Sequence, residues 1–581
     1  MKSRQFIYYF IAFLLALGLR FIGLGAVPLT DKEATLALQA LAIAHGEHPL
    51  LAGQPGYILL TSIPFYLFES TNFLARLIPA LAGSLLVFVP YFFFSPLPSL
   101  PPKGERTVLS PFGGERREGA WVGIVAAFLL AIAPGLVAVS RQASGTMLVI
   151  TFGLLARVMW SRKKPQLTGI FAGIALLGGP SVWLGLLITG LTWAVGQYVL
   201  PREDADEMES SQDQERSAKD ELKTAAIYEA GTLLMVGTLF FQAPNGISAL
   251  FSSLAEFING WRYASGVPIQ RIFGGLLAYY PLALLFGIIA SVRGIIKRDR
   301  ATLELSLWAL IALVLIAFYP AHQVSDLIWV GLPLWVLSAQ EISRHLQMPH
   351  YDRNETFGVF ALTILLLAFS WLNIAGAGLL GATEGMLLNR MILLGGSLVL
   401  LILSLVLIAI GWSLETAVLG GVWGTAFMLG LYTLSVAWGS SGLRTPKGVE
   451  IWDNVPLVAP TGLLLETVDE ISTWSRGDAE TLNITVKGID SSALLWELRH
   501  HSVQIVDVLD LNSNPELVIT SLDSENELSA TYRGQDFVWR TWPTWQLDTN
   551  TARWLVLREV PMQSEQIILW ARNDLFFDSQ N

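Results

Sequence analysis

The chain has 581 residues, of which 53% are hydrophobic and 14% are charged, whereas soluble globular domains average about 25% charged residues. This composition predicts a polytopic membrane protein rather than a soluble one. The net charge of −10 argues against nucleic acid as a partner. Because the sequence contains no cysteine, disulfides, thiolate metal sites and cysteine nucleophiles are excluded.

Apolar runs of roughly 20 residues, the length that an α-helix needs to cross a bilayer, recur along most of the chain. We predict about thirteen transmembrane helices, at residues 6–25, 74–95, 119–139, 145–160, 167–179, 182–199, 224–242, 272–292, 303–320, 324–341, 357–380, 389–412 and 415–438. The fifth and sixth are counted separately because GGPS at 178–181 indicates a turn. A further apolar stretch, 56–68, is short for a span and is predicted to be re-entrant or to lie on the membrane surface.

The distribution of Lys and Arg among the loops predicts the orientation. With Lys2 and Arg4 in the cytoplasm, the basic clusters at 103–117, 162–164 and 293–300 also fall on the cytoplasmic side. We therefore expect a plasma-membrane protein with a cytoplasmic N-terminus. An odd number of spans places the region after the last span outside the cell.

Two domains are predicted, a transmembrane domain at residues 1–440 and an extracytoplasmic domain at 441–581. Within the first, residues 26–73 are expected to form an external loop with interfacial helices, and residues 243–271 a second external loop. The segment 201–223 is acidic and is expected to be a solvated or disordered cytoplasmic linker.

In the C-terminal region the apolar residues shorten into strand-like runs, which predicts a small α/β domain. The predicted strands are 482–488, 502–508, 515–521 and 552–560, and the predicted helix is 491–501. Ser491 or Ser492 is expected to cap that helix.

The most informative stretch, PLTDKEATLALQALAIAHG (28–46), follows the first predicted span. Thr30 and Glu33 have the spacing of a capping box, which predicts a helix from Asp31 and explains these residues by structure alone. The helix is apolar on nearly all sides, so we expect it to be buried at the interface. Its charged N-terminus, with Asp31, Lys32 and Glu33, would then face a cavity, and a chemical role for these residues is equally open.

Together with NFLARLIPALAGSLLVFVPYFFF (72–94) and APGLVAVSRQASGTMLVITFGLLAR (133–157), this stretch resembles the N-terminal half of the GT-C membrane glycosyltransferases. The resemblance is to the family 39 type, which includes protein O-mannosyltransferases and aminoarabinose transferases, and especially to the Agl23-like branch. It implies a GT-C-like fold and inverting hexosyl or pentosyl transfer. The donor would be a polyprenyl-phosphate sugar, and the acceptor a lipid, protein or glycan on the outer face of the membrane.

In that family the first external loop carries an acidic pair, one member of which is the catalytic base. The matching positions are Asp31 and Glu33, so the resemblance implies Asp31 as the base and Glu33 as its partner. Lys32 separates the two acids, which departs from the family pattern. A carboxylate suits the reaction because it can take the proton of an acceptor hydroxyl that attacks the anomeric carbon. The phosphate leaving group needs positive charge instead.

Arg141 lies in a short external loop and matches an arginine common in the family, so the resemblance implies that it binds substrate. Its alternative role is that of an arginine anchored at the membrane interface. The family's Asp five residues further on is Thr146 here, and a lysine seen after the fifth span would fall near Gly179. These departures indicate a divergent substrate or weakened activity.

Five other residues are predicted to bind substrate on the outer side, namely Lys32, His322, Arg262, Tyr263 and Arg271. His322 lies in an external turn, where it would contact a phosphate, although a single interfacial histidine is commonly structural. Arg262, Tyr263 and Arg271 lie in the second external loop. Tyr263 is alternatively an aromatic residue of the membrane interface.

The seven histidines are scattered and predict no metal site. Asp31 and Glu33 could hold a divalent cation, Mg²⁺ or Mn²⁺, together with phosphate oxygens of the donor. Two alternatives to catalysis stay open: a degenerate GT-C relative that assists envelope glycan assembly or lipid-carrier handling, and a flippase or transporter. A transporter would show charges in the middle of its spans or inverted repeats, and the sequence shows neither.

Overall fold

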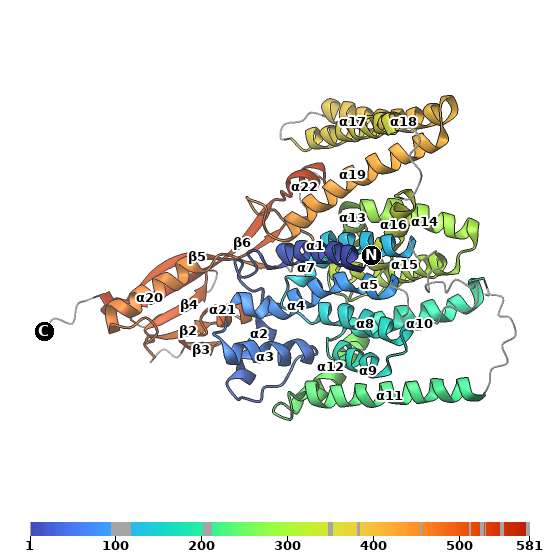
Figure 1. The fold of residues 1–581 in the computed structure, drawn as a ribbon. Helices are drawn as coiled ribbons and strands as arrows, with labels where there is room; N and C mark the ends of the chain where they lie inside the picture. Colours follow the sequence, from blue (N-terminus) through green and yellow to red (C-terminus); the bar gives the residue numbers. More distant parts are fainter. Residues whose placement is uncertain are drawn as a thin grey trace.

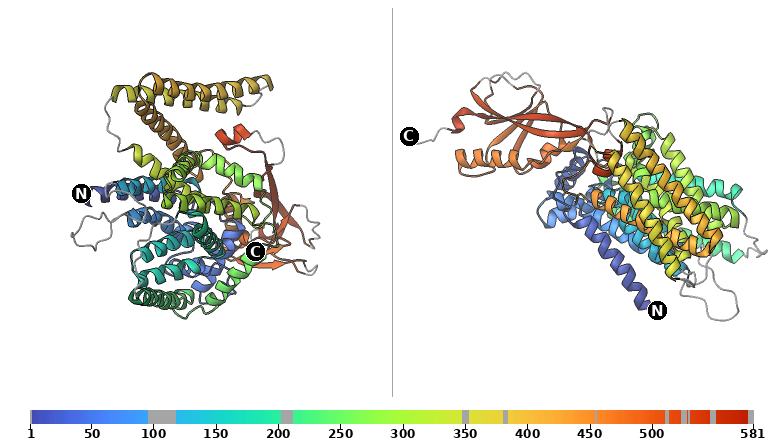
Figure 2. Two further views of the ribbon diagram at one scale, coloured as in Figure 1. Left: turned by 90° about the vertical axis from the view of Figure 1, so that its right-hand side faces the viewer. Right: turned by 90° about the horizontal axis from the view of Figure 1, so that it is seen from above.

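The structure is a computed structural model that describes residues 2–94, 118–201, 212–346, 353–379, 384–453, 456–509, 513–522, 528, 530–545 and 551–576. A long array of helices forms most of the molecule, and a sheet domain built from the C-terminal residues lies at one end of it (Figures 1 and 2). The predicted combination of a helical membrane region with a small α/β domain is therefore confirmed at this level.

The helical region consists of α1 (Lys2–Phe21), α2 (Asp31–Ala44), α3 (Pro55–Leu67), α4 (Asn72–Leu85), η1 (Leu86–Phe88), α5 (Val89–Phe94), α6 (Glu118–Ile132), α7 (Pro134–Ser140), α8 (Thr146–Ser161), α9 (Pro165–Leu176), α10 (Ser181–Val199), α11 (Gln212–Gly237), α12 (Asn245–Asn259), α13 (Ile269–Tyr279), α14 (Pro281–Lys297), α15 (Arg300–Phe318), η2 (Val324–Asp326), α16 (Leu327–His345), α17 (Arg353–Ala377), α18 (Glu384–Gly411) and α19 (Leu414–Ser440). Each of the thirteen predicted spans overlaps one or more of these helices.

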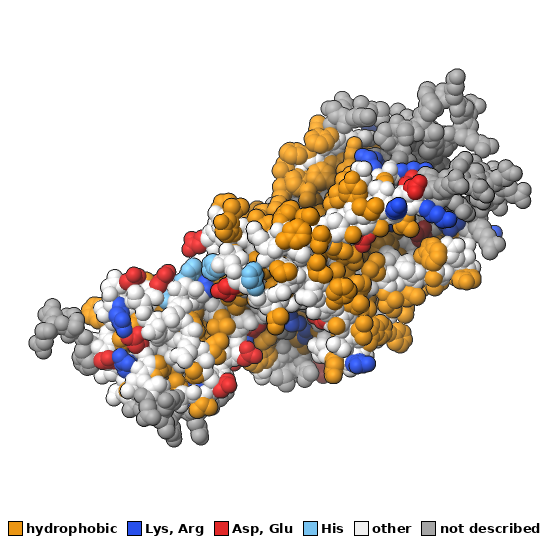
Figure 3. Space-filling view, turned by 90° about the horizontal axis from the view of Figure 1, so that it is seen from below, with side chains coloured by type: hydrophobic (Ala, Val, Ile, Leu, Met, Phe, Trp, Pro, Cys, Tyr) orange, Lys and Arg blue, Asp and Glu red, His pale blue; other side chains and the backbone are white. Residues whose placement is uncertain are grey.

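Fewer helices than the thirteen predicted are by themselves long and apolar enough to cross a membrane. Among the described residues six meet this requirement, or up to eight if each of two bent helix pairs is one span. The bends are 56° between α6 and α7 and 85° between α13 and α14. Apolar side chains cover much of the helical region in Figure 3, as expected for a surface that faces lipid. The count of thirteen spans stays a prediction.

Two segments between the predicted spans are helical. Residues 56–67 belong to α3, whose 13 residues give a helix about 20 Å long, too short for a hydrocarbon core of about 30 Å. The segment 201–223 is predicted to be a solvated or disordered linker, but from Gln212 onward it forms the start of helix α11. Its residues are mostly good helix formers such as Gln, Glu, Lys and Ala. Residues 202–211 lie outside the described part of the chain.

The C-terminal domain is built on a six-stranded mixed sheet in the order β1-β5-β6-β4-β2-β3. Its elements are β1 (Leu457–Val458), α20 (Gly462–Arg476), β2 (Asn483–Lys487), α21 (Ser492–Glu497), β3 (Ser502–Val506), β4 (Leu517–Ser521), β5 (Tyr532–Pro543), α22 (Thr551–Leu557), β6 (Met562–Arg572) and η3 (Asn573–Phe576). Strand β2 pairs in parallel with β3 and β4, while β4, β6, β5 and β1 pair antiparallel. The three predicted strands at 482–488, 502–508 and 515–521 are confirmed as β2, β3 and β4.

The predicted strand at 552–560 is wrong, because residues 551–557 form helix α22. The run WLVL is apolar in either conformation, and a short apolar run does not distinguish a strand from a helix turn. In α22 the ring of Trp554 is buried and lies 6.3 Å from the ring of Tyr279 in α13. This tertiary packing gives the segment its helical form.

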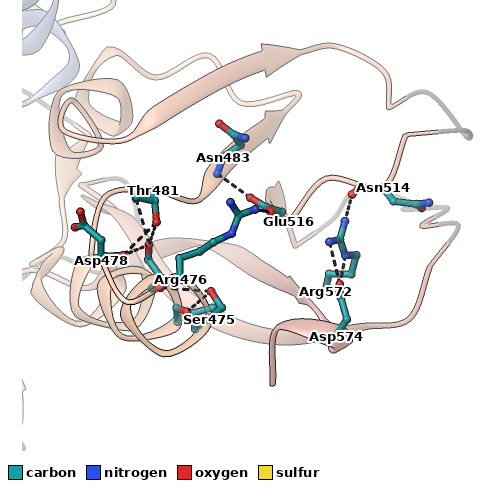
Figure 4. Close-up of polar contacts among 11 residues, drawn as sticks. Ser475, Arg476, Asp478, Thr481, Asn483, Asn514, Glu516, Arg572 and Asp574 are labelled. Atoms are coloured by element: carbon teal, nitrogen blue, oxygen red, sulfur yellow. Dashed lines mark hydrogen bonds and ion pairs between the residues drawn. The ribbon is translucent and has the colours of Figure 1, made fainter. Parts of the chain in front are cut away.

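Charged and polar contacts tie α20 to the sheet at the far end of the C-terminal domain (Figure 4). The carboxylate of Glu516 pairs with Arg476 of α20 and accepts a 3.2 Å hydrogen bond from the backbone N–H of Asn483. Nearby, Arg572 pairs with Asp574 at 2.6 Å. Such exposed pairs contribute only about 0–1 kcal/mol each, whereas strands β2 and β4 place buried apolar side chains in the core of this domain.

The two domains meet where α21 packs against α2. The indole Nε1 of Trp496 donates to Asn72 Oδ1 at 2.6 Å, and Arg499 donates to the backbone and hydroxyl of Ser70 at 2.7 and 3.0 Å. The interface therefore lies beside the predicted acidic motif at the N-terminus of α2.

Candidate functional site

Glu33 is the buried centre of the site. Its side chain forms a two-pronged ion pair with Arg76 of α4, with Nε to Oε1 and Nη2 to Oε2 both at 2.9 Å. The backbone N–H groups of Thr30 and Ala143 donate to the same carboxylate at 3.0 and 2.8 Å. The predicted capping box of Thr30 and Glu33 is confirmed. Glu33 thus connects the start of α2 to α4 and to the loop after α7.

These contacts determine the charge state of Glu33. Burial raises the pKa of its carboxyl group, but the neighbouring Arg76 guanidinium and the donated hydrogen bonds outweigh burial, so the pKa lies below its ordinary value. Arg76 is also held by the carbonyl oxygens of Leu24, Val27 and Pro28 at 3.3, 2.7 and 3.0 Å. Glu33 is therefore a charged, fully hydrogen-bonded anchor.

Asp31, the residue predicted to be the base, points toward the C-terminal domain. Its Oδ1 accepts hydrogen bonds from the hydroxyl of Ser491 at 2.6 Å and from the backbone N–H of Ala493 at 3.1 Å. Its Oδ2 pairs with Arg540 of β5 at 2.6 Å. The structure thus separates Asp31 from Glu33, and Asp31 connects α2 to α21 and the sheet.

Two cavities adjoin Glu33. The first, called the interdomain cavity, measures about 740 Å³ and lies between the helical region and the C-terminal domain. It is lined by parts of the segment 23–30 and Glu33, the end of α7, parts of the segments 439–453 and 457–464, and part of β5. Its walls carry the charged side chains Arg76, Arg141, Lys447, Glu450, Asp453 and Asp536 in addition to Glu33.

The second, called the loop cavity, measures about 900 Å³ and is lined by the start of α2, by α12 and the loop after it, and by Tyr319, Ala321, Gln323, Ser325 and Asp326. Lys32 and Tyr263, both predicted to bind substrate, lie in its wall. Glu33 and Gln142 line both cavities. The two spaces are therefore neighbours on either side of the Glu33 anchor.

Arg141 lines the interdomain cavity and at the same time caps α1. Its guanidinium donates to the carbonyl oxygens of Arg20, Ile22 and Gly23 at 2.9, 2.9 and 3.0 Å. Burial, with the nearby Arg76 charge, lowers the pKa of Arg141 to about 10. Arg141 remains cationic at neutral pH, and most of its donors are occupied by the end of the helix.

The remaining predicted residues lie apart from the cavities. Both ring nitrogens of His322 contact backbone carbonyl oxygens, of Tyr319 at 2.7 Å and of Val267 at 2.9 Å, so neither is directed at a phosphate. Arg271 lies over the ring of Trp545 at 5.0 Å. Arg262 is exposed in the loop after α12, and it lines neither cavity. Of the six residues predicted to bind substrate, three line a cavity: Lys32, Tyr263 and Arg141.

The structure adds two acids to the site, Glu450 and Asp453, in a turn that joins the last helix to the C-terminal domain. Glu450 is buried, pairs with Arg558 at 3.4 Å and accepts a hydrogen bond from the hydroxyl of Tyr279. Burial raises the pKa of Glu450 to about 7, against the lowering effect of Arg558. Burial also raises the pKa of Asp453.

Neither acid was singled out from the sequence, although two closely spaced acids in the segment that follows the last span are visible there. Arg76 was also missed. The sequence does place it inside an apolar segment, and a charged residue there is costly unless its charge is paired.

Within the described residues, no group of three or more His, Asp or Glu side chains could hold a metal ion. Asp31 and Glu33 direct their carboxylates into separate contacts with Arg540 and Arg76. The predicted Mg²⁺ or Mn²⁺ bound by these two acids therefore stays a prediction.

The helical array with a sheet domain at one end is a fold that this chain shares with a solved membrane-protein structure. The chain is similar to the crystal structure of ArnT from Cupriavidus metallidurans bound to undecaprenyl phosphate, with a TM-score of 0.53 and 14% sequence identity over 98% of this chain and 99% of that chain. The apo state of the same ArnT has a TM-score of 0.52 at 14% identity, with both chains covered fully. No protein-family model and no curated protein match the sequence.

A weaker similarity is to the archaeal oligosaccharyltransferase AglB from Archaeoglobus fulgidus in complex with an inhibitory peptide and a dolichol-phosphate. It has a TM-score of 0.39 and 13% identity over 90% of this chain and 69% of that chain. The predicted placement in the Agl23-like branch stays a prediction.

Proposed function

We propose that the protein is a membrane glycosyltransferase that moves a sugar from a polyprenyl-phosphate donor to an acceptor. The observation that carries this proposal is the pair of neighbouring cavities that share Glu33 and Gln142 in their walls. A transferase must bring two substrates to one point, and two adjoining cavities meet that need. The similarity of fold to ArnT bound to undecaprenyl phosphate supports a lipid-phosphate donor.

In this proposal the donor phosphate lies in the loop cavity beside Lys32. Among the described residues Lys32 forms no ion pair within 4.0 Å, so its ammonium is available to an anion. Burial raises the pKa of Glu256 across the same cavity, and the positive charge of Lys32 opposes this rise. A cation at this place stabilises the negative charge that develops on the phosphate as it leaves.

The acceptor, a lipid, protein or glycan, enters the interdomain cavity. One wall of that cavity comes from the helical region and the other from β5 and the segment before α20. The C-terminal domain therefore contributes to acceptor recognition. The Lys and Arg distribution supports a site on the outer face of the plasma membrane, with a cytoplasmic N-terminus.

A second candidate is a non-catalytic relative that binds the lipid carrier. The observation that favours it is that both acids of the predicted motif are engaged elsewhere, Glu33 by Arg76 and Asp31 by Arg540 and Ser491. Such a protein would bind a polyprenyl phosphate without consuming its sugar ester.

The test is turnover of a panel of radiolabelled polyprenyl-phosphate hexoses and pentoses by the purified protein in lipid, with lipid, peptide and glycan acceptors. The proposal predicts that one donor is consumed. Lys32→Met should then raise the KM for the donor about tenfold or more, because a charged hydrogen bond to phosphate contributes about 1.5–3 kcal/mol. The matched control, Lys219→Met, changes an exposed lysine of α11 and should leave KM unchanged. Binding without consumption of any donor would establish the non-catalytic alternative instead.

A further inference from the structure

A rigid turn presents one carboxylate to the interdomain cavity. In residues 450–453, the backbone N–H of Asp453 donates to the carbonyl of Glu450 at 3.3 Å, which closes the turn. Gln142 donates to the carbonyl of Trp452 at 2.8 Å, and the Trp452 ring packs edge-on against Tyr279 at 5.2 Å. The turn is therefore closed by its own hydrogen bond and held by Gln142 and Tyr279 from outside.

The carboxylate of Asp453 is the least engaged of the buried or half-buried acids in this cavity. Among the described residues its only hydrogen bond comes from the backbone N–H of Glu450, at 3.3 Å to Oδ2. By contrast, Glu33 is saturated by Arg76 and two backbone N–H groups. Glu450 is paired with Arg558, and Asp536 is exposed on β5.

The charges that face Asp453 are mixed. Burial and the negative charge of Glu33 raise its pKa, whereas Lys447, the N–H of Glu450 and Arg76 lower it. Arg141 lines the same cavity. The net result is a carboxyl group whose pKa is above its ordinary value, which makes its carboxylate a stronger base than that of an exposed aspartate.

We propose that Asp453, in the turn between the last helix and the C-terminal domain, is the general base of the transfer reaction. This inference rests on the proposed function. An acceptor O–H in the interdomain cavity attacks the anomeric carbon of the donor, and a new C–O bond forms as the bond from that carbon to the phosphate oxygen breaks. The hydroxyl proton passes to the Asp453 carboxylate, and the electron pair leaves with the polyprenyl phosphate, which Lys32 faces from the loop cavity.

Asp453 takes the place of Asp31 as the general base. Asp31 lines neither cavity, and its two oxygens are held by Ser491, Ala493 and Arg540. A base must lie within hydrogen-bond reach of the proton that it takes. Asp453 lines the acceptor cavity, and Asp31 does not.

The experiment compares Asp453→Asn, Asp453→Glu and Asp31→Asn with the wild-type protein in the donor assay. Loss of a general base lowers kcat by about 10²–10⁴-fold, so Asp453→Asn should show this loss with unchanged affinity for the donor. Asp453→Glu should recover part of kcat because it keeps a carboxylate. Asp31→Asn should keep kcat within a few-fold of wild type. The matched control, Asp507→Asn, changes an exposed acid after β3 and should have no effect.

A pH profile separates catalysis from a structural role. The wild-type rate should fall as the pH drops through the raised pKa of Asp453. Lys447→Met removes a charge that lowers this pKa, so it should move the acid limb to higher pH, a readout that does not require Asp453→Asn to fold. If the acid limb of the pH profile does not move in Lys447→Met, or if Asp453→Asn is as active as wild type, the assignment of Asp453 as the base is wrong, but the proposed function stands. A wild-type protein that consumes no donor would overturn the proposed function as well.

Discussion

Replacing Arg76 by methionine removes the partner of a buried charge and should destabilise the fold strongly. Breaking a buried ion pair by removing one member costs about 3–5 kcal/mol, because the other charge stays buried without compensation. In this protein the stranded group is Glu33, which keeps only the N–H groups of Thr30 and Ala143 and the Thr30 hydroxyl. We expect Arg76→Met to lose stability in this range.

The double variant Arg76→Met/Glu33→Gln should be less destabilised than Arg76→Met alone. It leaves no buried charge, and its main loss is the set of hydrogen bonds from Arg76 to the carbonyl oxygens of Leu24, Val27 and Pro28, at about 1 kcal/mol each. The chain's 20 tryptophans allow unfolding to be followed by intrinsic fluorescence in detergent, with exposed Arg353→Met as the matched control. Equal midpoints for Arg76→Met and the control would refute the reasoning.

The same pair predicts a pH dependence. Because the pKa of Glu33 is lowered in the folded protein, its contribution to stability is complete above the unfolded carboxyl pKa of about 4 and is lost as pH falls through the lower folded value. In the Arg76→Met variant, the decrease in stability between neutral and acid pH should be smaller than in the wild-type protein.

Three further predictions concern the domain junction, the buried turn and a close helix contact. Asp31→Asn removes the ion pair to Arg540 and weakens the hydrogen bonds to α21, so hydrogen exchange in α21 should speed up by a factor that corresponds to about 1 kcal/mol; unchanged exchange would contradict this. Burial raises the pKa of the Glu450 carboxyl group to about 7. The contribution of its protonated form to the free energy of unfolding is therefore complete below the ordinary carboxyl pKa and is lost as pH rises toward 7. Glu450→Gln should flatten the unfolding temperature between pH 5 and 8, and an unchanged slope would count against the assignment. Gly145→Ala places a Cβ 2.1 Å from the carbonyl oxygen of Gly178, and such overpacking should cost about 1–3 kcal/mol, measured by thermal unfolding.

The helices of this fold can be predicted from the sequence because each long apolar run by itself indicates a helix. The capping box of Thr30 and Glu33 is equally local, and so is the turn at 178–181, where Gly179 adopts a φ of +109°. Strands β2, β3 and β4 are short and flanked by turn residues. In each of these cases the neighbouring residues along the chain determine the conformation.

The site depends on contacts that the local sequence does not encode. Asp31 meets Arg540 across 509 positions, and nothing near Asp31 indicates that its carboxylate is directed at a strand of the other domain. Strand β5 was missed because Arg533, Gln535 and Asp536 interrupt its apolar pattern, while its register with β6 is set by pairing alone. The role of a charged residue in this protein therefore follows from the domain interface.

The most direct test of the central claim is a dual-label experiment, with one label on the donor sugar and a second on the lipid phosphate, in vesicles that contain the purified protein. A glycosyltransferase separates the labels: the sugar label should appear on the acceptor in a 1:1 ratio to the free polyprenyl phosphate released. Labels that stay together on the lipid, either bound to the protein or moved across the bilayer, would contradict the account and indicate a carrier-binding or transport protein.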